Sequence, residues 1–221
     1  DDRAGRGEFH AEGDGEDCDY DFVREDCATL LAESRDGLAR VTRIVQDLKS
    51  YSRVDESLWQ EADLNACVDS TLNVARHELK DKAEVVREYG KLPPVLCCPG
   101  QLNQVFMNLV INAAQALDKP GRITVRSGQV GDFVWVDVED TGKGIAPEQV
   151  KRIFEPFFTT KPVGQGTGLG LSLCWNIVKA HGGRIDVDSQ LGHGARFRVW
   201  VPLQAHATQP AGQATQGECS A

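Results

Sequence analysis

The sequence contains no long apolar run and fewer basic than acidic residues. Its 221 residues include 24 Lys and Arg against 33 Asp and Glu, a formal net charge of −9. A membrane helix needs about 20 consecutive apolar residues, and no segment approaches that length. A signal-peptide pattern is also absent from the start of the sequence. The acidic charge leaves no broad basic face for phosphates. We therefore expect no nucleic-acid partner and no membrane segment in this chain.

The seven cysteines follow neither a Cys-x-x-Cys pattern nor a Cys/His ligand spacing. The sequence thus offers no disulfide framework and no cysteine metal site. We expect reduced thiols, some of them buried, as is usual in the cytoplasm.

The two ends of the sequence are poor in apolar residues. Residues 1–19 are acidic and glycine-rich, and residues 204–221 are rich in Ala, Gln, Thr and Gly. Such compositions bury too little apolar surface to offset the entropy of ordering. We predict a disordered acidic segment at 1–19 and a disordered tail or linker at 204–221.

Residues 20–53 have the pattern of one long helix. Its two seven-residue series are Leu31, Leu38 and Val45, and Ser34, Val41 and Leu48. This spacing of three and four predicts a seam for a partner helix. A helix of about 45 Å could not bury that seam against itself. Packing of the helix on its own domain is the alternative.

Strand and helix patterns alternate from residue 59 to 203. The predicted strands are 59–64, 85–89, 122–127, 133–139, 184–188 and 196–202. The predicted helices are 65–80, 101–117, a short one from Pro147, and one ending near Ala180. Residues 128–132 read as a hairpin loop. Long antiparallel strands combined with helices predict an α+β two-layer sandwich.

Asn108 and Asn112 lie four residues apart on one predicted helix, so they share a face. Amide oxygens on adjacent turns can serve an octahedral Mg²⁺, which prefers oxygen ligands. Alternatively, both asparagines cap or brace neighbouring loops.

Asp140 ends a predicted strand and precedes Thr-Gly-Lys-Gly. Its carboxylate can accept a hydrogen bond from an exocyclic amine, while the glycines let the backbone approach a flat ring. A simple strand-end turn is the alternative.

Phe154–Lys161 combines an aromatic cluster with hydroxyls and a lysine, and Gly166–Gly170 precedes an apolar helix. The aromatics can anchor a mobile lid, and backbone N–H groups at the helix start can face an anion. Lys161 could reach a phosphate or could simply be solvated. The glycines fit neither a Walker A motif nor a dinucleotide fingerprint.

In this order, the four segments resemble the N, G1, F and G2 boxes of the sensor histidine kinase ATP-binding domain, within the GHKL superfamily. The resemblance covers roughly residues 22–203. It implies a Bergerat-type fold, in which a mixed sheet carries helices on one face, preceded by a long coiled-coil-type helix. Residues 20–53 resemble the second helix of the family's dimerisation hairpin, and residues 59–203 its catalytic domain.

The resemblance also implies roles for residues. Asn108 and Asn112 would bind Mg²⁺ and act in catalysis with Lys161, and Asp140 would read the adenine of ATP. The residues expected to bind nucleotide are Gln115, Asp140, Gly142, Gly144, Ile145, Phe154, Thr160, Lys161, Gly166, Thr167, Gly168, Leu169 and Gly170. Gln115 stands where many members have Lys, and Ala195 where many have Thr.

Asn108 favours a kinase. Relatives that hydrolyse ATP have a Glu at this place, and an amide cannot act as that base. The resemblance then implies transfer of the γ-phosphate to a histidine of the hairpin and onward to a response regulator Asp. It further implies a homodimer through the hairpin and a cytoplasmic location, with membrane attachment possible through a sensor region. An ATPase machine, a serine-directed kinase and a non-enzymatic dimerisation module are the alternatives.

The family's acceptor motif, His-Glu-x-x-Asn-Pro, does not occur in this sequence. His77-Glu78 lacks the Asn-Pro ending, and His10, His181, His193 and His206 lie in a tail, a helix end or a turn. We therefore read the sequence as one hairpin helix plus a catalytic domain, which should not phosphorylate itself.

Overall fold

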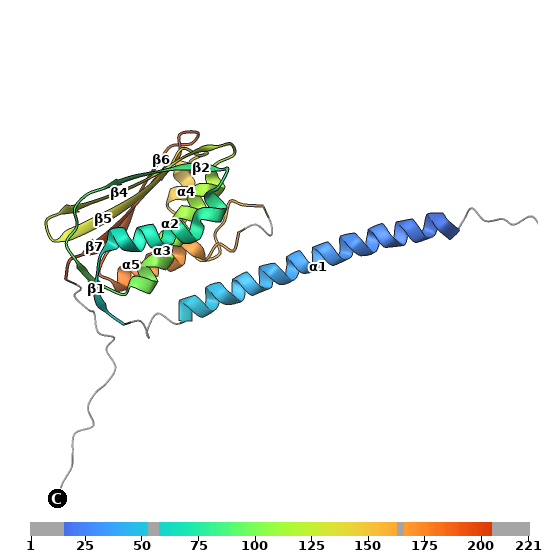
Figure 1. The fold of residues 1–221 in the computed structure, drawn as a ribbon, viewed down its shortest axis with the longest axis horizontal. Coiled ribbons are helices and arrows are strands. Elements are labelled where there is room, and N and C mark those ends of the chain that lie inside the picture. Colours follow the sequence, from blue (N-terminus) through green and yellow to red (C-terminus); the bar gives the residue numbers. More distant parts are fainter. Residues whose placement is uncertain (1–15, 53–57, 163–165, 205–221) are drawn as a thin grey trace, which may run out of the picture. The chain divides into compact units, whose positions relative to one another are not determined.

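The computed structural model of the chain describes residues 16–52, 58–162 and 166–204. Most of the two ends predicted to be disordered, residues 1–15 and 205–221, lies outside the described residues. The first element is the long helix α1 (Glu16–Ser52), shown in Figure 1. It begins four residues before the predicted start at Tyr20, so residues 16–19 belong to the helix rather than to the preceding segment. The apolar residues Leu31, Leu38 and Val45 are exposed along it.

The centre of the second compact unit is a five-stranded sheet in the order β2-β4-β5-β7-β6. Its strands are β2 (Ala83–Tyr89), β4 (Gly121–Val130), β5 (Phe133–Asp140), β6 (Arg184–Ser189) and β7 (Ala195–Pro202). Strand β2 is parallel to β4, and the other neighbours are antiparallel. The mixed sheet confirms the predicted α+β class.

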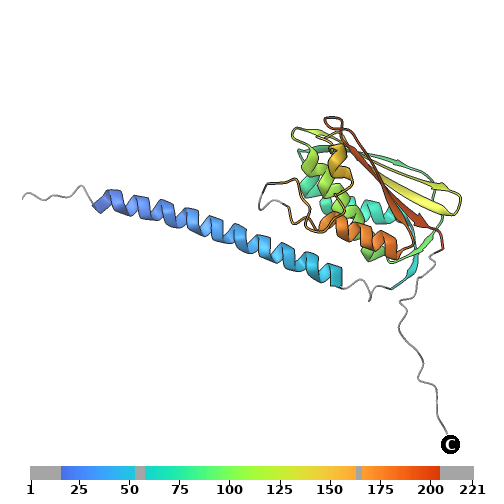
Figure 2. The ribbon, with the colours of Figure 1, turned by 180° about the vertical axis from the view of Figure 1, so that it is seen from behind.

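Three helices cover one face of this sheet, as Figures 1 and 2 show: α2 (Leu64–Leu79), α3 (Pro99–Ala116) and α5 (Gly170–Ala180). The short α4 (Pro147–Val150) starts at the predicted proline. Alternate residues of β5, including Val134, Val136 and Val138, point into the core beneath the helices. The sheet thus separates a helix-covered face from an open one.

A second, two-stranded sheet lies where the chain enters and leaves this unit. Strand β1 (Gln60–Ala62) pairs with β3 (Val95–Cys97), a three-residue strand that no sequence pattern predicted. The N–H of Leu96 donates to the carbonyl of Leu203 at 3.4 Å, and the N–H of Leu203 to that of Asp132 at 2.8 Å. The two connections of the unit therefore lie close together.

Two predicted boundaries were wrong for local reasons. The first strand ends at Ala62 because Asp63 caps α2, its Oδ1 accepting from the N–H of Asn65 at 2.8 Å. The β4–β5 loop is only two residues long because β4 continues to Val130.

Among the cysteines, Cys67, Cys97, Cys98 and Cys174 are buried, as the sequence predicted for some of them. No helix among the described residues combines the length and apolar content of a bilayer span.

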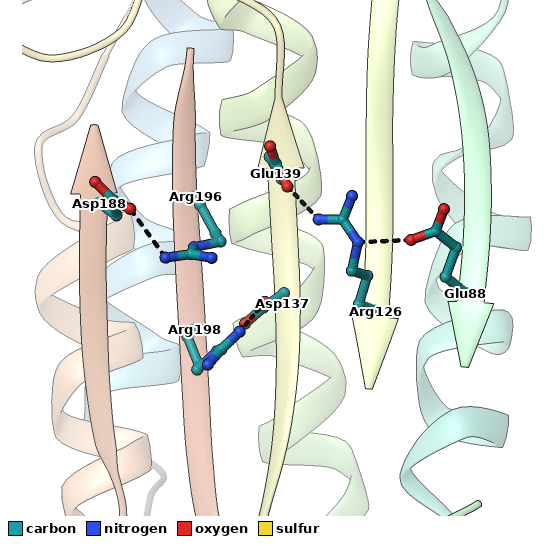
Figure 3. Close-up of polar contacts among 7 residues, drawn as sticks. All are labelled: Glu88, Arg126, Asp137, Glu139, Asp188, Arg196 and Arg198. Carbon is teal, nitrogen blue, oxygen red and sulfur yellow. Dashed lines mark hydrogen bonds and ion pairs between the residues drawn. The ribbon is translucent and has the colours of Figure 1, made fainter. Parts of the chain in front are cut away.

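The open face of the sheet carries a row of alternating charges across all five strands. In register, one from each strand, stand Glu88, Arg126, Asp137, Arg198 and Asp186. Arg126 Nε lies 2.6 Å from Glu88 Oε2, and both oxygens of Asp137 accept from Arg198 at 2.6 Å (Figure 3). Opposite charges on neighbouring strands favour this register and disfavour a slipped one.

His181, the residue after α5, is buried in the core. Its Nε2 accepts the N–H of Cys98 at 3.1 Å, and Nδ1 lies 2.8 Å from the carbonyl of Ile177 and donates to it. The ring of Trp59 lies 4.8 Å away. Burial lowers the pKa of His181 below its ordinary value of 6.5. A proton on Nε2 would also remove the acceptor for Cys98.

We expect His181 to make the domain less stable as the pH falls below about 6.5. In the unfolded chain the imidazole binds a proton there, whereas the folded one stays neutral to a lower pH. The free energy of unfolding should therefore decrease by up to about 1.4 kcal/mol per pH unit. Urea unfolding from pH 8 to 5 measures this slope. The His181→Gln variant should lose it and the exposed His77→Gln variant should keep it; equal slopes for wild type and His181→Gln would disprove the assignment.

Candidate functional site

Asp140 lies at the end of β5 with its side chain on the helix-covered side of the sheet, only 4% exposed. The N–H of Gly142 donates to Asp140 Oδ1 at 2.8 Å. Burial raises the pKa of the Asp140 carboxyl, and backbone hydrogen bonds from Gly142 and Ala195 oppose that rise. A carboxylate has about four acceptor positions, so these two donors leave room for a further one, such as an exocyclic amine. Ala195 contributes through its backbone, which does not require a threonine side chain.

The turn after Asp140 is anchored to the end of α3. The N–H of Lys143 donates to the carbonyl of Ala116 at 3.0 Å. Gly144 has a φ of +68°, and a Cβ atom there would lie 2.1 Å from the carbonyl oxygen of Gln190. Only glycine fits this position. The anchoring places the Asp140 turn beside the helix that carries the asparagines.

Ser189, which supports this turn, escaped the sequence analysis. The Ser189 hydroxyl accepts the N–H of Ile145 at 2.8 Å and donates to the carbonyl of Gly194 at 2.8 Å. Ile145 itself packs partly against the core. The pattern Gly192-His193-Gly194 between two predicted strands could have indicated a turn that needs glycine at two positions.

Asn108 lies where α3 meets the start of α5. A Cβ atom on Gly170, the first residue of α5, would be 3.3 Å from Asn108 Oδ1. The thiol of Cys174, one turn into α5, donates to the carbonyl of Val105 at 3.8 Å. Burial raises the pKa of this thiol to about 12, and the nearby Asn108 side chain opposes part of the rise. Asn108 therefore lies where the two helices meet.

Asn112 and Gln115 lie on the next turn of α3 and share one cation. The Lys161 ammonium donates to Asn112 Oδ1 at 3.2 Å and to Gln115 Oε1. Lys161 comes from the segment after α4, and its backbone N–H donates to Thr159 Oγ1 at 3.2 Å. The side-chain oxygens of Asn112 and Gln115 thus both accept from the Lys161 ammonium, and together they form a position that favours a cation.

The aromatic segment after α4 is attached to the domain at both of its ends. The Phe154 ring lies 5.1 Å from the ring of Trp175 on α5. Phe157 has a φ of +66°, rare for an aromatic residue, and its N–H donates to the carbonyl of Gly168 at 2.9 Å. Gly168 has a φ of +67°, and a Cβ there would lie 2.4 Å from the carbonyl carbon of Phe157.

The remaining predicted residues lie in the segment between the aromatic cluster and α5. A Cβ on Gly166 would lie 3.2 Å from the Lys161 stem, and Thr167 Oγ1 accepts the N–H of Leu169 at 3.4 Å. Leu169 is buried at the start of α5, and its own side chain makes no capping hydrogen bond to the helix. Thr160 is exposed.

The side chains present suit a magnesium nucleotide. Asp140 offers a desolvated acceptor for an amine, and Asn112 already holds a cation at its oxygen. The amide oxygens of α3 are the candidate metal ligands, because one of them already accepts from the Lys161 ammonium. The described residues contain no cluster of three His, Cys, Asp or Glu that could hold a metal. An uncapped helix start at Gly170 and the Lys161 ammonium add positive potential for phosphates.

The family model "Histidine kinase-, DNA gyrase B-, and HSP90-like ATPase" matches residues 98–205. The sensor histidine kinase ZraS of Escherichia coli O157:H7 is 37% identical over 187 residues, which are 84% of this chain and 40% of ZraS. The chain thus spans less than half the length of this curated relative.

Solved structures agree with the sequence comparison. The catalytic domain of the histidine kinase ThkA has a TM-score of 0.62 and 31% identity, covering 68% of this chain and 99% of that domain. Full-length ShkA in complex with AMPPNP has a TM-score of 0.69 and 28% identity, covering 83% of this chain and 40% of ShkA. With almost an entire histidine kinase catalytic domain covered and the four motifs gathered on one side of the sheet, this chain belongs to the sensor histidine kinase family and contains its ATP-binding catalytic domain.

Proposed function

We propose that this chain binds Mg-ATP and transfers its γ-phosphate to a histidine on a dimerisation hairpin, from which a response regulator Asp receives it. The proposal rests mainly on Asp140, a buried carboxylate at the end of β5 that can accept a further hydrogen bond from an amine. The Asp140 turn lies beside α3, where the Asn112 oxygen accepts from the Lys161 ammonium. The AMPPNP complex of the related ShkA supports ATP as the substrate class.

Each part of the site has a separate task in this proposal. Asp140 accepts from the adenine amine, and Gly142 and Gly144 let the backbone lie close to the ring. Lys161 and the N–H groups at Gly170 bind phosphate oxygens. Asn108 and Asn112 would bind Mg²⁺, which neutralises phosphate charge when bound. Catalysis by these residues is positioning and charge stabilisation, which is what phosphoryl transfer requires.

Asn108 favours transfer over hydrolysis. Its amide lies close to Gly170 at the start of α5 and has no basic lone pair with which to activate water. The site therefore protects ATP until an imidazole nitrogen of an acceptor approaches the γ-phosphorus. Steady phosphate release by the chain alone would favour the ATPase alternative.

We further propose that the acceptor histidine belongs to another helix. His181 is buried with both ring nitrogens engaged, His77 is exposed on α2, His193 is exposed in the turn between β6 and β7, and His10 and His206 lie outside the described residues. The apolar seam of α1 would pair with the hairpin helices of a homodimer.

A response regulator is the expected receiver partner, because the related ThkA forms a complex with the response regulator TrrA. We place the domain in the cytoplasm, where ATP and such a regulator would be found.

Transfer of γ-³²P from ATP tests the function. The chain is incubated with Mg²⁺ alone and with a peptide that carries a hairpin acceptor helix with the His-Glu-x-x-Asn-Pro motif. We expect acid-labile label, which marks phosphohistidine, on the peptide only. Label on the chain itself would overturn the assignment of the acceptor, and acid-stable label on the peptide would indicate a serine-directed kinase.

A further inference from the structure

Lys161 and Gln115 are in contact although they lie in different segments of the chain. Gln115 is a neutral amide on α3, three residues after Asn112. The ammonium of Lys161, 46 residues further along the chain, donates to the Gln115 side-chain oxygen. The segment after α4 therefore supplies a cation to this part of α3.

Asn112 cannot keep Lys161 when the proposed metal is bound. The Asn112 oxygen that accepts from Lys161 at 3.2 Å is also the proposed ligand for Mg²⁺. A divalent cation and an ammonium on the same oxygen would repel each other strongly at such short range. Gln115, three residues later on the same face of α3, is outside the proposed ligand set and can retain Lys161.

We propose, on the basis of the proposed function, that Gln115 is a positioning residue that holds the Lys161 ammonium beside the terminal phosphates of ATP. Its oxygen accepts from the ammonium without adding a negative charge near the triphosphate, which a Glu would do. Its exposed position on α3 leaves it free of any packing role in the core. Gln115 thus acts through Lys161 and contributes to the binding of the distal phosphates and not of adenine.

The test measures equilibrium binding of AMPPNP and of AMP, both with Mg²⁺, to the full chain. A hydrogen bond to a charged group contributes enough that Gln115→Leu should weaken AMPPNP binding about tenfold. AMP lacks the distal phosphates, so its affinity should change less than about twofold. Gln129→Leu, a matched change of an exposed glutamine near the end of β4, should alter neither affinity. Equal losses for AMPPNP and AMP would show a general structural role and overturn the proposal.

A double-mutant cycle makes the test specific to the pair. In a Lys161→Met background, Gln115→Leu should cause no further loss of AMPPNP affinity, because the residue it holds is gone. Additive losses would contradict the proposal. If wild type binds AMPPNP and Gln115→Leu binds it equally well, only this inference fails. If wild type binds no adenine nucleotide, the proposed function fails and this inference with it.

Discussion

Replacing Asn112 by Ala should lower phosphoryl transfer to a supplied acceptor helix by about a thousandfold, which corresponds to roughly 4 kcal/mol of lost transition-state stabilisation. The change removes the oxygen that holds a cation in the structure. Without it, both the proposed metal and Lys161 lose a contact, and the charge of the triphosphate is no longer neutralised in a fixed geometry. Initial rates of label transfer at saturating ATP measure the loss.

The control for Asn112 is the same change at an exposed position of another helix. Asn73 is exposed on α2, a helix that carries none of the candidate site residues, so Asn73→Ala should keep the wild-type rate. Adenosine binding should survive in Asn112→Ala, because Asp140 and its turn are untouched. A transfer rate within tenfold of wild type would remove Asn112 from the list of metal ligands.

Replacing Asp137 by Ala should lower the free energy of unfolding by about 3 kcal/mol. Asp137 is 1% exposed and accepts two hydrogen bonds from Arg198, whose side chain is 28% exposed. The guanidinium also lies over the ring of Trp135, 4.3 Å from its centroid. Removing the carboxylate leaves that cation poorly solvated on the open face, and this desolvation is the main source of the loss. Urea unfolding followed by circular dichroism measures it.

Asp188 offers a matched comparison on the same face. It pairs with Arg196 at 2.9 Å, but its side chain is 76% exposed (Figure 3). Water replaces such a partner readily, so Asp188→Ala should cost less than about 1 kcal/mol. Similar losses for the two variants would mean that burial does not set the strength of these ion pairs.

The sequence predicted the fold class and the four motifs because they depend on residues with special backbone or donor properties. Asp140 with its following glycines, and two asparagines one turn apart, are recognisable without knowledge of distant contacts. Strand β3 escaped because three residues are too few for a period to appear. The β4–β5 boundary was misplaced because Gly128 reads as a turn residue, whereas here it makes room for the Trp135 ring.

Contacts between distant segments could not be read from the sequence. Gln115 was recognisable only as a departure from Lys, because its partner Lys161 lies in another segment. The row from Glu88 to Asp186 likewise depends on strand register, since alternation along a strand shows which residues share a face but not which of them meet. Ser189 supports the Asp140 turn from a strand that follows it by about 50 residues.

The chain joins the catalytic unit at the end of the sheet opposite Asp140. Phe133 pairs with Pro202 at the joined end, where Leu203 and Leu96 also meet, and Asp140 pairs with Ala195 at the far end. The eight residues of β5 between these ends span about 24 Å. Asp140 and its turn therefore lie a full strand length away from the segments through which the chain enters and leaves the sheet.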